Sequence, residues 1–151
     1  TSFIDTHCHL DKLDSTPEAA VNEAKDVGVQ QMLTISVDEQ SLDFVLNAVQ
    51  KFPEVYGSVG FHPHDAPSLN ESLQNKMRPL AQAEDKMIAI GETGLEYQYM
   101  YSPVEVQQQV FRQQLTIAEE LNLPIVMHSR EAEADTPVSY THLTLPTTPY
   151  V

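Results

Sequence analysis

The chain has 151 residues, of which 41% are apolar and 20% charged, so it is long enough for one globular domain with a sizeable core. Its 22 acidic and 8 basic residues give a net charge of −14, which argues against a protein that coats duplex DNA, since that class is basic. No apolar run approaches the ~20 residues of a membrane span, and the single cysteine, Cys8, cannot form an internal disulfide, so we expect a cytoplasmic protein with no membrane partner.

Strands and helices are predicted to alternate from the beginning of the chain. Short, nearly continuous apolar segments are typical of parallel strands that are buried on both faces. Five segments fit this description: Phe3–Thr6, Met32–Val37, Val55–Phe61, Met87–Gly91 and Ile125–Met127.

Helices are predicted between these strands. Ser15–Thr16–Pro17 and Ser102–Pro103 each indicate a helix start, with a hydroxyl as N-cap and proline in the first turn. A weaker helix is predicted over Leu69–Glu84. Apolar residues recur with helical spacing in two of the segments, at Leu42, Val45, Leu46 and Val49 and at Phe111, Leu115 and Ala118.

This alternation predicts an α/β fold with a parallel sheet, either open or closed into a barrel. No Gly-x-Gly-x-x-Gly follows the first strand, so a dinucleotide-binding fold loses its main support. A TIM-type (β/α)8 barrel normally needs about 250 residues, so we expect only about the first five βα units. A sixth element begins near Glu131.

The last fifteen residues differ in composition from the rest. Residues 137–151 contain no charged residue, three prolines and four threonines. We therefore predict two parts: residues 1–136 as the N-terminal part of a barrel, and residues 137–151 as a non-native or disordered tail.

Histidines gather where the predicted strands end. His7 and His9 follow the first strand, and because side chains alternate along a strand they point to the same side. His62 and His64 follow the third strand, and His128 the fifth. Barrel enzymes place their sites at this end of the strands, so five histidines here favour a functional site over chance.

The fourth strand adds a carboxylate, Glu92, flanked by glycines. Imidazoles with one carboxylate suit Zn²⁺, Mn²⁺ or a similar ion. A carboxylate shared by two ions makes a centre that activates water and holds phosphoryl oxygens. The bound ions would also supply positive charge for a phosphodiester despite the acidic chain. Arg130 is predicted either to bind phosphate through its forked donors or to pair with an acid such as Glu131.

Four motifs in this order resemble the TatD-like metal-dependent hydrolases, a branch of the amidohydrolase-type barrels. They are FIDTHCHLD at Phe3–Asp11, GFHPH at Gly60–His64, GETGLEY at Gly91–Tyr97 and PIVMHSRE at Pro124–Glu131. The resemblance implies two divalent ions, Mg²⁺, Mn²⁺ or Zn²⁺, with ligands at His7, His9, Glu92 and His128. It makes Glu92 a catalytic residue as well.

The resemblance also implies a substrate. In that family the His-Pro-His after the third strand is associated with substrate phosphate, here His62 and His64. Members act as divalent-metal-dependent deoxyribonucleases, some as 3′→5′ exonucleases on DNA or RNA. DNA, including single strands and 3′ ends, is therefore the implied partner.

The sequence departs from the family pattern at two points. The family usually has Asp where Glu96 stands. It also takes a histidine from its sixth strand and an aspartate from its eighth, and neither strand is expected here; His142 lacks the expected surroundings. We therefore expect phosphodiester hydrolysis in an intact parent protein and little activity in this chain alone.

Two other interpretations remain open. One is an amide or lactone hydrolase of the same superfamily, because His-x-His barrels support both chemistries. It is weakened because no lysine stands at the fourth or fifth strand end, where a carboxylated lysine would be expected. The other is a non-catalytic fragment whose unpaired sheet edges invite aggregation.

Overall fold

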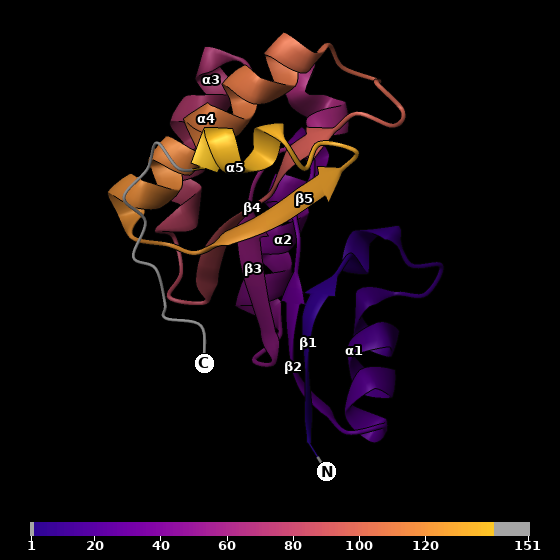
Figure 1. Ribbon diagram of the computed structural model, residues 1–151. Helices are drawn as coiled ribbons and strands as arrows, with labels where there is room; N and C mark the ends of the chain where they lie inside the picture. The colour runs from indigo at the N-terminus through magenta and orange to yellow at the C-terminus, as the bar shows by residue number, and fades with distance from the viewer. Residues whose placement is uncertain (1, 141–151) are drawn as a thin grey trace, which may run out of the picture.

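The computed structural model describes residues 2–140, which form a five-stranded parallel sheet with helices packed against it (Figure 1). The strands lie in the order in which they occur in the chain, each pairing with the next. They are β1 (Phe3–Cys8), β2 (Val29–Thr34), β3 (Val55–Val59), β4 (Met87–Glu96) and β5 (Ile125–Arg130). This order and the alternation with helices confirm the predicted first five units of a (β/α)8 barrel.

A helix follows each strand. The helices are α1 (Pro17–Asp26), α2 (Glu39–Lys51), α3 (Glu71–Ala81), α4 (Val104–Leu121) and α5 (Asp135–Tyr140). Two short 3-10 helices, η1 (Leu10–Lys12) and η2 (Pro63–Ser68), were not predicted. His9 and His62 are their N-cap residues, so the two short helices follow β1 and β3 at the positions of the paired histidines.

Capping residues explain where the helices start. Thr16 accepts a hydrogen bond from the backbone N–H of Ala19 at 3.2 Å, as predicted for the start of α1. The prediction for α4 was wrong in detail, because Pro103 occupies the N-cap position and Ser102 does not cap the helix. The Ser102 hydroxyl instead donates to the backbone oxygen of His64 at 3.0 Å, which ties two loops together.

The hydrophobic core lies between the sheet and the helices. The predicted helix faces are buried there, with Val45 and Val49 of α2 and Phe111 and Leu115 of α4 fully enclosed. A large aromatic ring such as Phe111 contributes several kcal/mol when it leaves water, roughly 3–5 kcal/mol on truncation to alanine. These contacts fix the helices, and through them the loops that carry the site.

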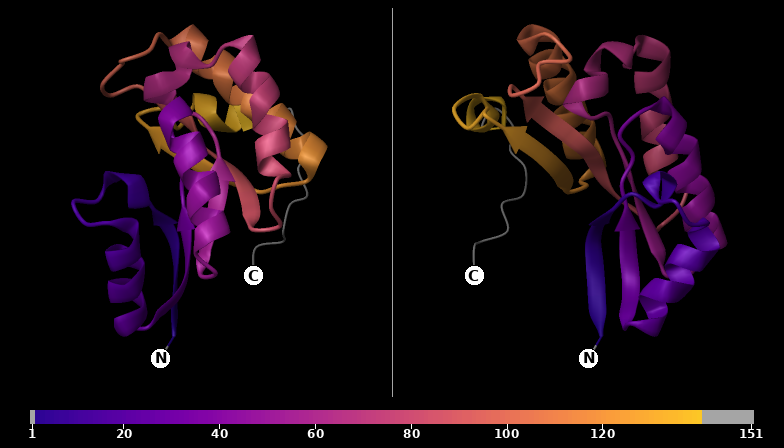
Figure 2. Two further views of the ribbon diagram at one scale, coloured as in Figure 1. Left: turned by 180° about the vertical axis from the view of Figure 1, so that it is seen from behind. Right: turned by 90° about the vertical axis from the view of Figure 1, so that its right-hand side faces the viewer.

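The sheet curls, so that β1 and β5 lie at its two ends (Figure 2). Within residues 2–140 each of these strands pairs on one side only. Phe3 and Ile4 of β1 are therefore 54% and 64% exposed although they are apolar. No helix among the described residues is long and apolar enough to cross a lipid bilayer.

The strand limits differ from those predicted, most of all at β4. The strand was predicted over Met87–Gly91, yet β4 continues through Gly94 to Glu96 and stays paired with β5. Both glycines have positive φ, 140° and 147°, and a Cβ at either would meet the backbone of β5. They permit close approach of two strands instead of ending one.

The predicted tail overlaps the last described helix. α5 runs from Asp135 to Tyr140 and so crosses the boundary predicted after residue 136. Residues 141–151, which include His142, lie outside the described residues, and the division into barrel and tail stays a prediction.

Candidate metal centre

Glu92 stands at the centre of the predicted site, and the backbone holds it in place from two sides. Its N–H donates to the carbonyl oxygen of Ser36 at 2.9 Å, just after β2. The hydroxyl of Ser58 in β3 donates to the carbonyl oxygen of Gly91 at 2.6 Å, and the Gly91–Glu92 peptide bond is cis. Three neighbouring strands thus fix the position from which the carboxylate points.

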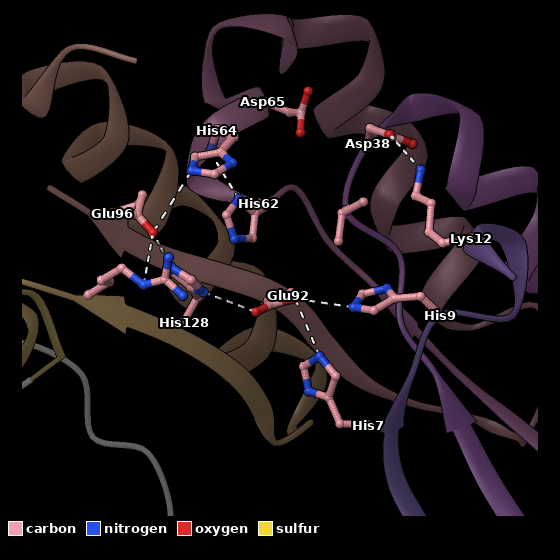
Figure 3. A pocket seen from close by; sticks show the side chains of 12 residues that line it. His7, His9, Lys12, Asp38, His62, His64, Asp65, Glu92, Glu96 and His128 are labelled. Atoms are coloured by element: carbon pink, nitrogen blue, oxygen red, sulfur yellow. Dashed lines mark hydrogen bonds and ion pairs between the residues drawn. The ribbon is translucent and has the colours of Figure 1, made fainter. Parts of the chain in front are cut away.

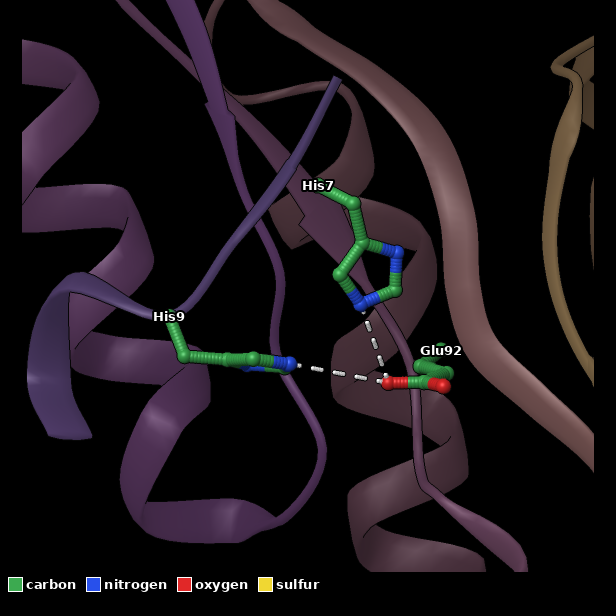
Figure 4. Close-up of side chains that lie close together, drawn as sticks. All are labelled: His7, His9 and Glu92. Carbon is green, nitrogen blue, oxygen red and sulfur yellow. Dashed lines mark ion pairs between the residues drawn. The ribbon is translucent and has the colours of Figure 1, made fainter. Parts of the chain in front are cut away.

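The two histidines of the first motif lie on one oxygen of this carboxylate (Figure 4). His7 Nε2 is 3.4 Å and His9 Nε2 3.7 Å from Glu92 Oε2. His9 Nδ1 lies 3.2 Å from the carbonyl oxygen of Ile35, which can only accept, so that nitrogen carries the proton. The lone pair of His9 Nε2 is therefore free to bind a cation on the side of Glu92.

His128 lies on the other oxygen of Glu92 (Figure 3). Its Nδ1 is 3.2 Å from Glu92 Oε1, and its Nε2 is 2.9 Å from Glu96 Oε2. Glu96 is fully buried, and its second oxygen accepts the backbone N–H groups of Gln98 and Tyr99 at 3.0 and 3.3 Å. Glu96 therefore anchors both His128 and the loop after β4.

Burial and neighbouring charges act in opposite directions on these groups. Burial disfavours the carboxylate of Glu92, but the hydrogen bond to His128 and the nearby imidazoles outweigh it, so the pKa of Glu92 is lowered. Burial is likewise outweighed at Glu96, whose pKa is lowered by His128 and two backbone N–H groups. The same contacts, Glu92 foremost, raise the pKa of His128.

His62 and His64 lie on the opposite wall of the same cavity, with the rings of His62 and His128 4.4 Å apart. His62 Nδ1 accepts the backbone N–H of His64 at 3.1 Å, which leaves Nε2 to carry the proton of the neutral ring. Burial, reinforced by the charge of His128, lowers the pKa of His62 to about 4. His62 is thus a neutral hydrogen-bond donor at neutral pH.

His64 and Arg130 converge on Glu96. His64 Nε2 is buried without a hydrogen-bond partner among residues 2–140, and Glu96 Oε2 is 3.8 Å away. Arg130 Nε is 3.6 Å from the same oxygen. The acid that pairs with Arg130 is therefore Glu96 and not Glu131.

The structure brings all seven predicted site residues to one cavity of about 470 Å³. Lys12, Val37, Asp38, Asp65 and Glu96 also line it and were not predicted as site residues. Glu96 could have been found, because positions 92, 94 and 96 of one strand share a face. The others come from the short helices η1 and η2 and from the segment before α2, which have no periodic pattern in the sequence.

The donor set fits a divalent ion. The ligand atoms of His7, His9 and Glu92 all lie within 4.8 Å of one another, as do those of His62, Glu92 and His128. Separations of 3.4 and 3.7 Å from Glu92 Oε2 suit two ligands of one ion, whose bonds are about 2.0–2.2 Å long. The tautomer of His62 makes it a better donor to an anion than a metal ligand.

A parallel barrel sheet with two histidines, a central glutamate and a third histidine at its carboxyl ends defines the metal-dependent hydrolase class of barrels. The family model described as TatD related DNase matches residues 4–144. The chain belongs to this family.

Individual relatives agree with this assignment. An uncharacterized metal-dependent hydrolase of Bacillus subtilis (strain 168), YabD, is 34% identical over 135 residues, covering 88% of this chain and 52% of the relative. The 3′-5′ ssDNA/RNA exonuclease TatD of Yersinia pseudotuberculosis serotype O:3 is 37% identical over 113 residues, covering 74% of this chain and 43% of the exonuclease. The chain spans about half the length of the relatives it matches.

A solved structure shares the fold. The TatD homolog YJJV from Escherichia coli K12 superposes with a TM-score of 0.86 at 26% identity, over 95% of this chain and 57% of that one. The five described units are therefore part of a TatD-type barrel.

Proposed function

We propose that the protein to which this chain belongs hydrolyses phosphodiester bonds of nucleic acid with the help of divalent ions held at His7, His9, Glu92 and His128. One observation carries the proposal: histidines from the first and fifth strands meet on the two oxygens of one buried carboxylate (Figure 3). Evenly spread surface histidines would not share a partner in this way. Names of relatives, including ssDNA/RNA exonucleases, support nucleic acid as substrate.

Each residue has a separate task in this proposal. A divalent ion, when bound, polarises the phosphoryl group and lowers the pKa of water. Glu92 holds the two ligand groups together and orients them. Glu96 fixes the ring of His128 through a 2.9 Å contact, as outer partners of metal-binding histidines commonly do.

The opposite wall of the cavity suits the phosphate. His62 presents an N–H while remaining neutral, and the His64 nitrogen without a partner can donate to an oxygen of the substrate. Arg130 is half-exposed and can turn its remaining N–H groups to the phosphate while Nε stays near Glu96. Because the chain carries a net charge of −14, substrate binding should depend on the ions.

The proposal is tested on an oligonucleotide substrate with and without chelator. We expect cleavage by the wild-type protein, here the intact parent protein to which this chain belongs, to stop in excess chelator and to return with Mg²⁺, Mn²⁺ or Zn²⁺. Glu92→Gln should abolish both the returning activity and Mn²⁺ binding measured by calorimetry. Glu54→Gln, a change at a partly buried carboxylate that pairs with Lys25 and does not line the cavity, is the control and should change neither.

Three results would overturn the proposal. Undiminished cleavage in chelator would remove the role of the metal. Metal-dependent turnover of amide or lactone substrates without cleavage of oligonucleotides would assign the site to the other chemistry that His-x-His barrels support. Metal binding by the parent protein with no hydrolysis of either substrate would leave the site without a catalytic role.

A further inference from the structure

Two tyrosines stand side by side in the loop between β4 and α4. Tyr99 and Tyr101 are 49% and 69% exposed. Their rings are nearly parallel, with an interplanar angle of 15° and centroids 5.8 Å apart. Tyr101 and Arg130 both lie against the Tyr99 ring, so Tyr101 carries more of the exposed ring surface, which offers a flat apolar face to a ligand.

These rings adjoin the phosphate side of the cavity. His64 meets Tyr101 edge-on with ring centroids 4.7 Å apart, and Arg130 lies over Tyr99 with Cζ 5.6 Å from the ring centre. His64 and Arg130 both line the cavity. A ligand with a phosphate beside His64 would therefore have its next flat group within reach of the tyrosines.

The loop is held in place before any ligand binds. Glu96 accepts the backbone N–H of Tyr99 at 3.3 Å. Further along, Ser102 donates to the carbonyl oxygen of His64 at 3.0 Å, and the side chain of Gln107 donates to the carbonyl oxygen of Ser102 at 2.8 Å. A loop fixed at both ends loses little freedom on binding, which favours affinity.

The combination of flat faces, a guanidinium and a phosphate site matches single-stranded nucleic acid. Every base has a π-face that can stack on tyrosine, whereas a base inside a duplex has both faces covered by its neighbours. Lipid chains or a hydrophobic peptide would not require an adjoining anion site. We propose that Tyr99 and Tyr101 form a stacking platform for one unpaired base next to the phosphate bound at His64 and Arg130.

This inference rests on the proposed function, and its test separates the two. Steady-state cleavage is measured on a single-stranded oligonucleotide and on the same strand with an abasic analogue at successive positions. Removal of one stacking partner should raise KM about tenfold, within the 5- to 150-fold that base stacking supports. At one abasic position we expect KM to rise in the wild-type protein. On that same abasic strand, Tyr99→Ala and Tyr101→Ala should raise KM no further.

Conservative and remote variants serve as controls. Tyr99→Phe and Tyr101→Phe keep the stacking face and should retain a KM within about twofold of wild type. Tyr56→Ala removes a tyrosine near the amino end of β3, whereas the site lies at the carboxyl ends of the strands, and should leave KM unchanged. Binding of an oligonucleotide with a 2-aminopurine base should quench its fluorescence in wild type and not in the alanine variants.

The outcomes are distinct. If cleavage depends on metal but KM changes neither with the abasic position nor in the alanine variants, the platform is overturned and the proposed function stands. An equal KM increase for intact and abasic strands would show that the tyrosines only support the loop, which also overturns it. Absence of cleavage and of oligonucleotide binding in the wild-type protein would reject platform and proposed function together.

Discussion

Replacing Gly94 by alanine should damage the fold and the candidate site at the same time. A Cβ at this position would lie 1.9 Å from the carbonyl oxygen of His128, far inside the ~3.3 Å at which a carbon and such an oxygen meet. The φ of 147° is also one that residues with a side chain rarely adopt. Since the clash is with backbone, β4 and β5 must move apart.

The cost has two parts. The unfavourable φ contributes about 1–3 kcal/mol, and displacement of a packed strand contributes about 1–3 kcal/mol more. Together they amount to roughly 2–6 kcal/mol, a large share of the 5–15 kcal/mol by which proteins are stable. Gly94 pairs in register with His128, so the same displacement moves that ring away from Glu92.

Urea unfolding followed by circular dichroism measures the first effect, and calorimetric Mn²⁺ binding the second. We expect Mn²⁺ affinity to fall about 10–100-fold, as when partners of metal ligands are lost. Gly28→Ala is the control, because Gly28 also has a positive φ, 98°, but lies between α1 and the amino end of β2, away from the carboxyl ends of the strands. It should cost about 1–2 kcal/mol and leave Mn²⁺ affinity unchanged. Equal losses of stability in the two variants would refute the reasoning.

Three further changes probe the core and a helix cap, each by urea unfolding. Phe111→Ala should lower the free energy of unfolding by about 3–5 kcal/mol, because the ring is fully buried; a loss below 1 kcal/mol would contradict the packing. Ser58→Ala should cost about 1–3 kcal/mol, since the carbonyl of Gly91 loses its 2.6 Å donor. Asp38→Asn keeps the N-cap of α2 but removes the charge. Burial tends to raise the pKa of Asp38, but the hydrogen bonds from Ser41 and the charge of Lys12 outweigh it and lower the pKa. The wild-type advantage should therefore be full above the unfolded-state pKa of about 3.9, and vanish as pH falls through the native pKa; equal stability at pH 7 would disprove it.

The architecture could be predicted because it depends on local patterns that repeat. The spacing of Val45 and Val49, or of Phe111 and Leu115, is set by the helix itself, so the faces that enter the core are visible in the sequence. Strand order follows from the alternation of elements. The limits of β4 could not be predicted, because a glycine in the sequence is compatible with two outcomes. It can interrupt a strand, or it can let two strands approach closely.

The candidate site was predictable to the extent that it lies at strand ends. His7, Glu92 and His128 come together because parallel strands end at one rim, as the sequence indicated. Ligation of a metal by them stays a prediction. The position of Glu96 on the same strand face as Glu92 could have been predicted, but its contacts could not, because they depend on the loop after β4 and on the ring of His128.

The sharing of Glu92 between two groups of histidines has a thermodynamic consequence. One oxygen faces His7 and His9 and the other faces His128, so an ion bound by one group changes the charge available to the other. Where each group binds an ion, as in the proposed function, the two affinities are linked by one coupling free energy, which acts equally in both directions. A substitution at His128 should alter the affinity measured at His7 and His9, although no atom of theirs has changed.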